Sequence, residues 1–140
     1  MSRYLLDTDT ITLAHYGQAA VVQHLAAHLD ADVAVPALSV QEQMRGWLAH
    51  LSHLRTRPQM ADWYDFLVNR MFPIWKRYAL LPFPEPAILR YEHLKTLRLN
   101  VGAMDLRIAA VALENGLTVV TRNRRDFGRV PGLTTEDWSV

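Results

Sequence analysis

Short apolar runs alternate with longer segments of helical periodicity, and this alternation most constrains what the chain can fold into. Five runs are predicted to be strands: residues 3–6, 32–35, 79–83, 117–121 and 133–135. Apolar side chains recur at helical spacing in four segments: residues 11–16, 19–29, 87–97 and 102–115. Strands that alternate with helices pair in parallel and are covered on both faces. The sequence therefore predicts an α/β protein, a three-layer α/β/α sandwich with a mostly parallel central sheet.

The chain has the length of one domain, so we expect a single domain over residues 1–140. It contains no cysteine, which excludes disulfides and thiolate metal sites and fits a cytoplasmic protein. Asp7 comes too early for the apolar segment of a signal peptide, and no apolar run is long enough to span a bilayer. The net charge is only +1, so affinity for nucleic acid would require local basic patches.

Several residues predict where helices begin and end. Gly17 and Gly116 each follow a helical segment, in the position typical of a left-handed C-cap. Ser39 and Glu42 have the spacing of a capping box, which predicts a helix starting there and running toward residue 53. Residues 58–78 are rich in aromatic side chains and are expected to be helical as far as Pro73.

Four carboxylates lie at or near predicted junctions between strands and helices. Asp7 ends the first strand, Glu42 follows the second, and Asp126 follows the fourth. Asp105 opens the helical segment before the fourth strand. If the strands are parallel, all four acids gather at the carboxyl rim of the sheet, where open α/β folds bind ligands. Crowded carboxylates repel one another, so such a cluster requires a cation.

Each acid also has a simpler explanation. Asp7 could only cap the following helix, and Glu42 could only complete the capping box. Asp126 could be a solvated turn residue, with Asn123 a competing ligand. Asp105 is harder to explain in this way, because it shares a helical stripe with apolar residues, where an unpaired acid is costly. Taken together, these oxygen donors suit Mg²⁺ or Mn²⁺, ions that activate water for attack on phosphate esters.

Three stretches of the sequence resemble PIN-domain ribonucleases. They are residues 5–8, 39–46 and, most specifically, 105–127. The likeness covers essentially the whole chain and is greatest to the VapC toxins of toxin–antitoxin pairs, whose chains often continue, as here, toward a tryptophan like Trp138. The resemblance implies an α/β/α sandwich that uses Mg²⁺ or Mn²⁺ to cleave single-stranded or loop RNA, with transfer-RNA-like molecules among the expected substrates. It also implies a homodimer inhibited by a small VapB-like antitoxin.

The resemblance also implies roles for individual residues. Asp7, Glu42 and Asp105 would be the core catalytic and metal-binding acids, with Asp126 as the fourth. Thr8 and Asn123 would support or substitute for these ligands. Asp9 departs from the family, which more often has a neutral polar residue there, and it would cap the first helix or reach the metal through water.

Arginines surround Asp126 in the C-terminal region. Arg122, Arg124, Arg125 and Arg129 follow the fourth strand closely, and Arg45 lies one turn after Glu42. Such a loop could simply be solvated, or it could attract an acidic antitoxin tail. Beside a metal cluster we expect these arginines to contact RNA phosphates, which supply affinity without reading sequence.

Other functions remain open at this point. A non-catalytic PIN relative could bind RNA or protein without chemistry. Asp7 and Asp9 imitate the opening motif of haloacid-dehalogenase-type phosphatases, although the downstream lysine and late acidic pair of that family are absent. A receiver domain would likewise need a lysine after a late strand. The histidine pairs 24/28 and 50/53 lack a third zinc ligand and are interpreted as surface residues, and the aromatic segment 58–78 as core and dimer packing.

Overall fold

The computed structural model describes residues 2–140 and contains a five-stranded sheet in the order β3-β2-β1-β4-β5. Its strands are β1 (Tyr4–Leu6), β2 (Val33–Pro36), β3 (Ala79–Leu81), β4 (Thr118–Val120) and β5 (Thr135–Glu136). Every neighbouring pair is parallel, with Leu5 opposite Ala34 on one side and Val119 on the other. The predicted parallel sheet is confirmed, and β1 lies at its centre.

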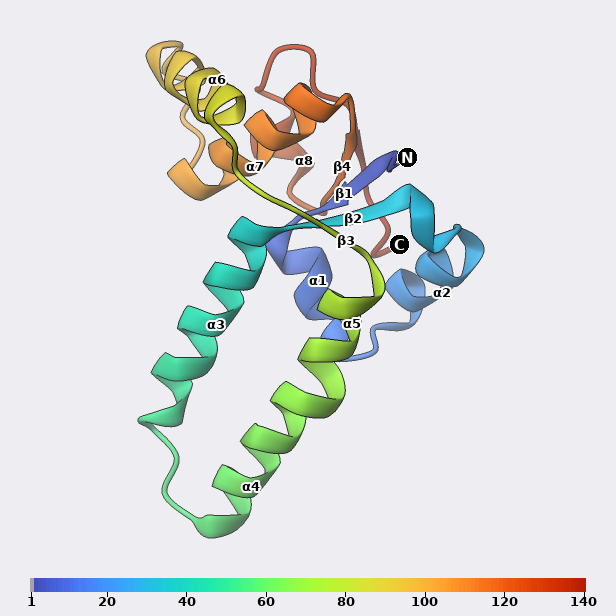
Figure 1. Cartoon of the computed structure of the whole chain (residues 1–140), viewed down its shortest axis with the longest axis vertical. Helices are drawn as coiled ribbons and strands as arrows, with labels where there is room; N and C mark the ends of the chain where they lie inside the picture. The colour runs from blue at the N-terminus through green and yellow to red at the C-terminus, as the bar shows by residue number, and fades with distance from the viewer. Residues whose placement is uncertain (1) are drawn as a thin grey trace.

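Helices cover both faces of the sheet (Figure 1). One layer contains α1 (Thr8–His15), α2 (Ala19–Ala27), α3 (Ala37–Leu51), α4 (Arg57–Phe66) and α5 (Phe72–Arg77). The opposite layer contains α6 (Glu85–Thr96), α7 (Ala103–Asn115) and α8 (Arg124–Phe127). Two short turns complete the chain: the 3-10 turn η1 (Asp30–Asp32) and the π-helical turn η2 (Leu67–Met71). The predicted three-layer sandwich is confirmed.

Successive residues of β1 and β2 enter different cores, which explains why the sequences of these two strands are apolar throughout. Leu5 packs in the core beneath α6 and α7, whereas Tyr4 and Leu6 pack in the core beneath α1 and α2. Ala34 and Val35 of β2 divide in the same way. Full burial of each large aliphatic side chain contributes about 1.5–3 kcal/mol to stability. A slip of one residue in the register would exchange the two sets.

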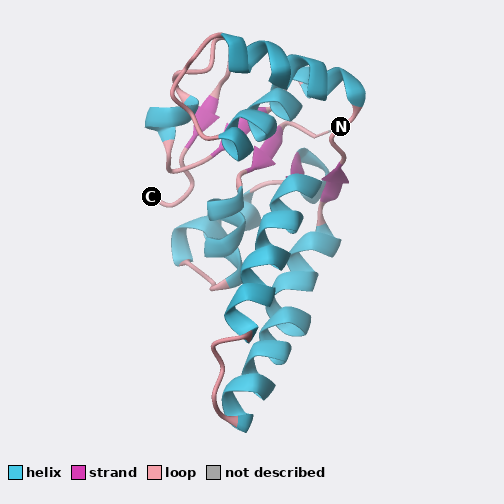
Figure 2. Cartoon of the chain, turned by 90° about the vertical axis from the view of Figure 1, so that its left-hand side faces the viewer, coloured by secondary structure: helices cyan, strands magenta, loops and turns pink. Residues whose placement is uncertain are grey.

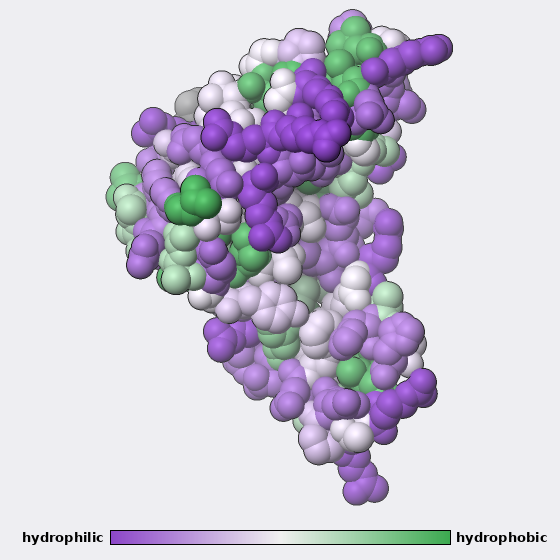
Figure 3. All heavy atoms as spheres, turned by 180° about the vertical axis from the view of Figure 1, so that it is seen from behind, coloured by the Kyte–Doolittle hydropathy of each residue, from purple (hydrophilic) through white to green (hydrophobic). Residues whose placement is uncertain are grey.

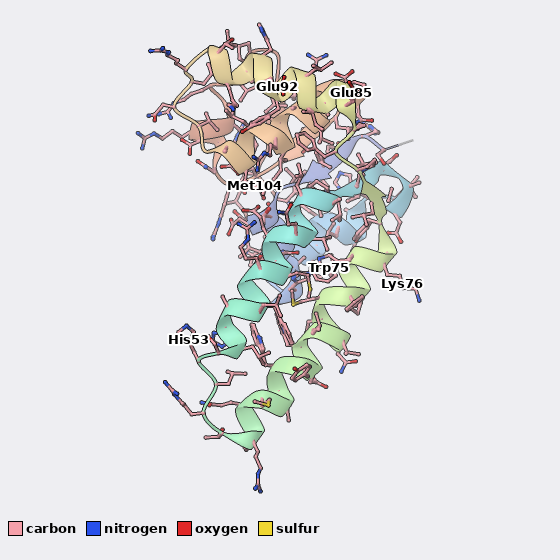
Figure 4. All side chains as sticks on the ribbon, turned by 60° about the vertical axis from the view of Figure 1, so that its left-hand side comes forward. His53, Trp75, Lys76, Glu85, Glu92 and Met104 are labelled. Carbon is pink, nitrogen blue, oxygen red and sulfur yellow. The ribbon has the colours of Figure 1, made fainter. Side chains whose placement is uncertain are left out.

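Helices α3 and α4 form a hairpin that extends well beyond the sheet (Figures 1 and 2). Trp47 and Trp63 join them through two reciprocal bonds, in which each indole N–H donates to the other residue's carbonyl at 3.1 and 3.0 Å. Trp75 lies near the sheet end of this hairpin, and His53 lies just beyond the end of α3 (Figure 4).

The surface on the far side from the view of Figure 1 is largely hydrophilic, and its apolar patches are separate from one another (Figure 3). No helix among residues 2–140 combines the length and apolar character that a bilayer crossing requires.

The capping box predicted at Ser39 is wrong. Helix α3 begins two residues earlier, at Ala37, directly after the extended Pro36. The earlier start buries Leu38 in the core, and it leaves Ser39 inside the helix, hydrogen-bonded with Thr8 at 2.8 Å. Glu42 is therefore not tied to a helix N-terminus, and its carboxylate is free to face α1.

The expected helix end at Pro73 is also wrong. The chain passes from α4 through η2 into α5, and Pro73 occupies the first turn of α5, where its missing N–H is not needed. Gly17 and Gly116 do have the predicted left-handed conformation, with φ of 71° and 65°. The fifth strand was predicted two residues too early, because a turn at residues 131–132 and two irregular residues precede β5.

Candidate functional site

Asp7 is fixed at the carboxyl end of the central strand. Its backbone N–H donates to the carbonyl of Val120 in β4 (3.0 Å), which extends the ladder between β1 and β4 by one residue. Its side chain accepts from the backbone N–H of Thr10 at 2.8 Å, so Asp7 is the N-cap of α1. The side chain is only 4% exposed. Burial, the largest cause, raises the pKa of Asp7, although hydrogen bonds from Thr121 and Thr10 oppose the shift. Asp7 therefore does cap α1, and its backbone bond to β4 holds it at the carboxyl rim of the sheet.

Asp105 lies in the first turn of α7, half-buried and facing the other acids. Burial raises its pKa to about 6, and the charges of Asp7, Glu42 and Asp126 add to the shift in that order. Three acids distant in sequence therefore lie within electrostatic range of Asp105. The structure brings Asp7, Glu42 and Asp105 together around one cavity at the sheet rim, whereas Asp126 lies near enough to affect Asp105 but does not line that cavity.

Glu42 projects from α3 toward the start of α1. The Thr8 hydroxyl lies 2.5 Å from Oε1 of Glu42 and 2.8 Å from the Ser39 hydroxyl. Thr8 thus connects α1 to α3 and orients the Glu42 carboxylate. A supporting role for Thr8, predicted by resemblance, agrees with this geometry.

Asp126 lies in α8, a short helix in a region that was expected to be a loop, and Asn123 directly precedes this helix. Asn123 caps this helix, and its Nδ2 donates to Oδ2 of Asp126 at 3.0 Å. The other carboxylate oxygen accepts from Nη1 of Arg129 at 3.2 Å. Both oxygens of Asp126 are therefore engaged, whereas the exposed Asn123 lines the acidic cavity.

An open cavity of about 690 Å³ lies between α1, α3, the start of α7 and the segment that follows β4. Its lining is Asp7, Thr8, Asp9, Thr12, Glu42, Asp105, Arg122 and Asn123. Thr12 was missed by the sequence analysis, although its spacing of four residues from Thr8 places both on one face of α1. Gln43 holds this face, because its Nε2 donates to Oγ1 of Thr12 at 3.0 Å.

The cavity offers a donor set that fits a hard divalent cation. All its acidic and amide donors are oxygens, the ligands that Mg²⁺ and Mn²⁺ prefer. Within residues 2–140, no three acidic or histidine side chains form a group that could hold an ion as they stand. Burial is the main cause of the raised pKa of Asp105, and the negative charges of Asp7, Glu42 and Asp126 add to it; a divalent cation would counter both.

Asp9 does not cap α1 but forms an ion pair with Arg122 at the mouth of the cavity. Nε of Arg122 donates to Oδ2 at 2.5 Å, and Nη2 donates to Oδ1 at 3.1 Å. This bidentate pair joins α1 to the segment after β4. One predicted RNA contact, Arg122, is therefore already engaged by the acid that departs from the family pattern.

The remaining arginines differ in how firmly they are held. Arg129 donates to Asp126 and to the carbonyl of Asn100, while Arg124 makes one long bond of 3.4 Å to Thr135. Arg45 and Arg125 are exposed and form no ion pair among residues 2–140. These two are the most accessible of the predicted phosphate contacts.

The paired histidines of the sequence, His24, His28 and His50, pack on tryptophans and do not line the acidic cavity. The rings of His24 and His28 stack on Trp138, with centroid distances of 5.5 and 4.5 Å. His50 packs on Trp63 at 4.4 Å. These contacts account for the histidines as packing residues.

A family model described as the PIN domain matches residues 4–133. Two curated sequence relatives match a shorter segment, and both are described as tRNA(fMet)-specific endonuclease VapC. The protein from Shigella flexneri is 56% identical over 39 residues, which are 28% of this chain and 30% of that relative. The protein from Salmonella typhimurium is 53% identical over 38 residues, which are 27% of this chain and 29% of that relative. The matches thus span less than a third of these relatives.

Solved structures resemble the chain over nearly its whole length. FitAcB from Neisseria gonorrhoeae has a TM-score of 0.74 and 27% identity, with 96% of each chain covered. DNA-bound VapBC from Salmonella typhimurium has a TM-score of 0.80 and 22% identity, with 99% of each chain covered. The second likeness shows the fold alone.

Proposed function

Because this chain belongs to the PIN domain family, we propose that it is a Mg²⁺- or Mn²⁺-dependent endoribonuclease of the VapC type. Its substrate would be single-stranded or loop RNA, such as a transfer-RNA loop, and it would act in the cytoplasm. The short curated matches to endonucleases described as specific for tRNA(fMet) support this substrate class.

One observation carries the proposal: carboxylates from four separate elements influence one another at the carboxyl rim. Asp7 follows β1, Glu42 lies on α3, Asp105 on α7 and Asp126 on α8. The pKa of Asp105 is raised to about 6 partly by the charges of the other three. Helix caps and solvated residues do not require proximity to other acids, and the repulsion between these carboxylates costs free energy.

The residues of the cavity have different roles in the proposed reaction. Mg²⁺ or Mn²⁺ bound there supplies Lewis-acid activation of water and neutralisation of phosphate charge. Asp7, fixed by β4 and by Thr10, and Glu42, oriented by Thr8, would provide rigid anionic ligands. Asp105, with a pKa near neutrality, would ionise when it joins them and could otherwise hold a proton at the cavity wall. Attack of water in line on the scissile phosphate leaves a 3′-hydroxyl.

The first test is RNA cleavage by the Asp7→Asn variant in Mg²⁺ or Mn²⁺. We expect at least a 100-fold loss of rate, which corresponds to about 3 kcal/mol of lost transition-state stabilisation. Asparagine can still accept the bond from Thr10, so the cap and the fold should survive. Glu85→Gln, at an exposed position on α6 away from the rim (Figure 4), is the control. Equal rates for Asp7→Asn and the wild type would remove Asp7 from the mechanism.

We further propose that the chain is the toxin of a pair, forms a homodimer and is inhibited by a small VapB-like antitoxin. The solved relatives include VapBC from Rickettsia felis bound to a promoter DNA fragment and FitAB bound to a DNA fragment. Those complexes support an antitoxin partner that also binds DNA. Co-expression with the neighbouring small gene product should abolish RNA cleavage and yield a complex on gel filtration.

Phosphate contacts can be tested through the salt dependence of RNA binding. Arg125→Gln should weaken binding to all single-stranded RNAs by a similar factor. It should also lower the slope of log affinity against log salt by about one counterion. Fluorescence anisotropy in EDTA, from 50 to 200 mM salt (roughly the range over which such contacts weaken), measures both effects. An unchanged slope would exclude Arg125 from the RNA contact.

A non-catalytic RNA- or protein-binding PIN module is the second candidate. Two observations favour it: no three acids yet form a group able to hold a metal among residues 2–140, and Asp126 is bound by Arg129. Calorimetric titration separates the two candidates, because RNA affinity in a binding module would be indifferent to divalent ions.

A further inference from the structure

A second cavity of about 320 Å³ lies beside the acidic one, between α1, α3 and the segment from α4 to η2. The two cavities share Thr8, Thr12 and Glu42 in their linings, so they adjoin each other along α1. An extended ligand whose phosphate lies among the acids can therefore place a neighbouring group in the second cavity.

Aromatic rings form much of its wall. Trp63 and Phe66 stack at 5.4 Å with an angle of 6° between their planes, and Tyr16 lies 4.8 Å from Phe66. Trp47 stacks on Trp63 at 6.1 Å and 7°, and their reciprocal hydrogen bonds fix both rings. Tyr16 is 65% exposed, which leaves one face of the aromatic group open to solvent.

Gly46 keeps the cavity open. It lies in the interior of α3, where glycine destabilises a helix relative to alanine. A side chain at this position would meet no protein atom within 4 Å of its Cβ. Packing therefore does not require a glycine here. Gly46 lines the cavity, however, so a larger side chain would occupy its space.

His15 supplies an unsatisfied polar group in the same wall. It is 3% exposed, and its Nε2 has no hydrogen-bond partner in the structure of residues 2–140. Burial lowers the pKa of His15 to about 4, so the ring is neutral at physiological pH. Because Nε2 is itself buried and the backbone of Met71 lies close to the ring, His15 contributes a neutral wall to the cavity.

We propose that this cavity binds one unstacked nucleobase of the RNA, next to the phosphate that the acidic cluster would cleave. This inference rests on the proposed function. Single-stranded RNA is recognised by bases that leave the stack and lie against aromatic rings, and the volume suits a small flat ligand. The aromatic segment, interpreted from sequence as core and dimer packing, thus also forms a binding surface.

The direct test uses methionine methyl resonances in metal-free protein labelled with ¹³C-methyl methionine. Met71 lines the cavity, whereas Met60 lies on α4 outside it and serves as reference. Titration with adenosine, which carries the base without a phosphate for the acids to repel, should shift Met71 and not Met60. Ribose, which lacks the base, should leave Met71 unchanged. An unshifted Met71 at the solubility limit of adenosine would overturn the proposal.

Two pairs of variants locate the base. Gly46→Leu fills the cavity and should abolish the Met71 shift, whereas Ala49→Leu adds the same side chain to an exposed position of α3 outside it. In EDTA, Gly46→Leu should weaken binding of a single-stranded RNA ten-mer by about 5- to 150-fold, the range that stacking of one base provides. If Gly46→Leu does not fold, Tyr16→Ala and Tyr16→Phe replace it, and only the alanine variant should lose affinity.

These measurements need neither metal nor cleavage, so they separate this inference from the proposed function. If the base shifts Met71 but the protein cleaves no RNA, the base site is supported and the proposed nuclease activity is contradicted. A Gly46→Leu variant that binds and cleaves RNA like the wild type, yet escapes its antitoxin, would assign the cavity to a protein partner and overturn the proposal.

Discussion

The Asp105→Asn variant is expected to lose RNA cleavage and, without metal, to be more stable than the wild type. Asparagine keeps the size of the side chain but removes one of four mutually repelling charges. The proposed reaction needs that charge to hold a cation, so the rate should fall at least about 100-fold. An opposite change in stability and activity distinguishes a functional acid from a structural one.

The sign of the stability change follows from the raised pKa of Asp105. In the folded protein the carboxyl keeps its proton up to a pH of about 6, whereas its ordinary value is 3.8. Between these values the folded state binds more protons than the unfolded state, so the free energy of unfolding falls as pH rises. Above pH 6 the destabilisation is fully present. The shift corresponds to about 3 kcal/mol, reduced to about 1–2 kcal/mol because Asp105 is half-exposed.

Urea unfolding of both proteins in EDTA, from pH 4 to pH 8, measures the effect. The free energies of unfolding should be similar near pH 4, diverge as the pH rises to about 6, and then differ by a constant amount, with Asp105→Asn the more stable. Glu114→Gln is the matched control, since Glu114 lies on α7 but pairs with Arg90 at 2.7 Å, away from the rim. Adding Mg²⁺ or Mn²⁺ should then stabilise the wild type more than the variant. A variant less stable than the wild type at pH 8 would show that Asp105 has a structural role.

Replacement of Trp138 by alanine should have the largest effect on folding. Its side chain is 1% exposed and packs on Tyr4 at 5.1 Å and on His28 at 4.5 Å. Removing a buried tryptophan costs about 3–5 kcal/mol, a large part of the stability of a domain this size. The indole joins the C-terminal segment to β1 and α2, on the side of the sheet opposite α7.

Urea unfolding followed by circular dichroism tests this expectation. Trp138→Phe retains an aromatic ring and should lose clearly less stability than Trp138→Ala. Because Trp138 does not line the acidic cavity, cleavage per folded molecule should not change in either variant. A loss below about 1 kcal/mol for the alanine variant would show that the segment contributes little to stability.

The centre of the sheet could be predicted because β1, β2 and β4 are largely buried on both faces, whereas the edge strands β3 and β5 are partly exposed. Residues such as Leu5 and Leu6 enter different cores, which leaves a continuous apolar run in the sequence. Once the strands are parallel, the position of Asp7 at the rim follows from chain order alone. Asp105 could be singled out because it interrupts an apolar helical stripe.

The remaining features depend on contacts between distant segments. Ser39 and Glu42 have the spacing of a cap, but burial of Leu38 favours an earlier helix start, and Thr8 binds both side chains instead. The pairing of Asp9 with Arg122 joins residues more than a hundred positions apart. No local pattern predicts such a pair, nor the π-helical turn that carries the chain past residue 67.

The order of the strands also affects when the protein can become active during synthesis. The central strand is made first, but its neighbour β4 and the acid of α8 lie close to the other end of the chain. A ribosome-bound fragment that lacks them holds Asp7 without the Val120 carbonyl that fixes it. Since domains fold as units once their sequence has emerged, a truncated product carries an incomplete acidic cluster. A nuclease of the proposed kind would therefore stay inactive until β4 and α8 have been synthesised.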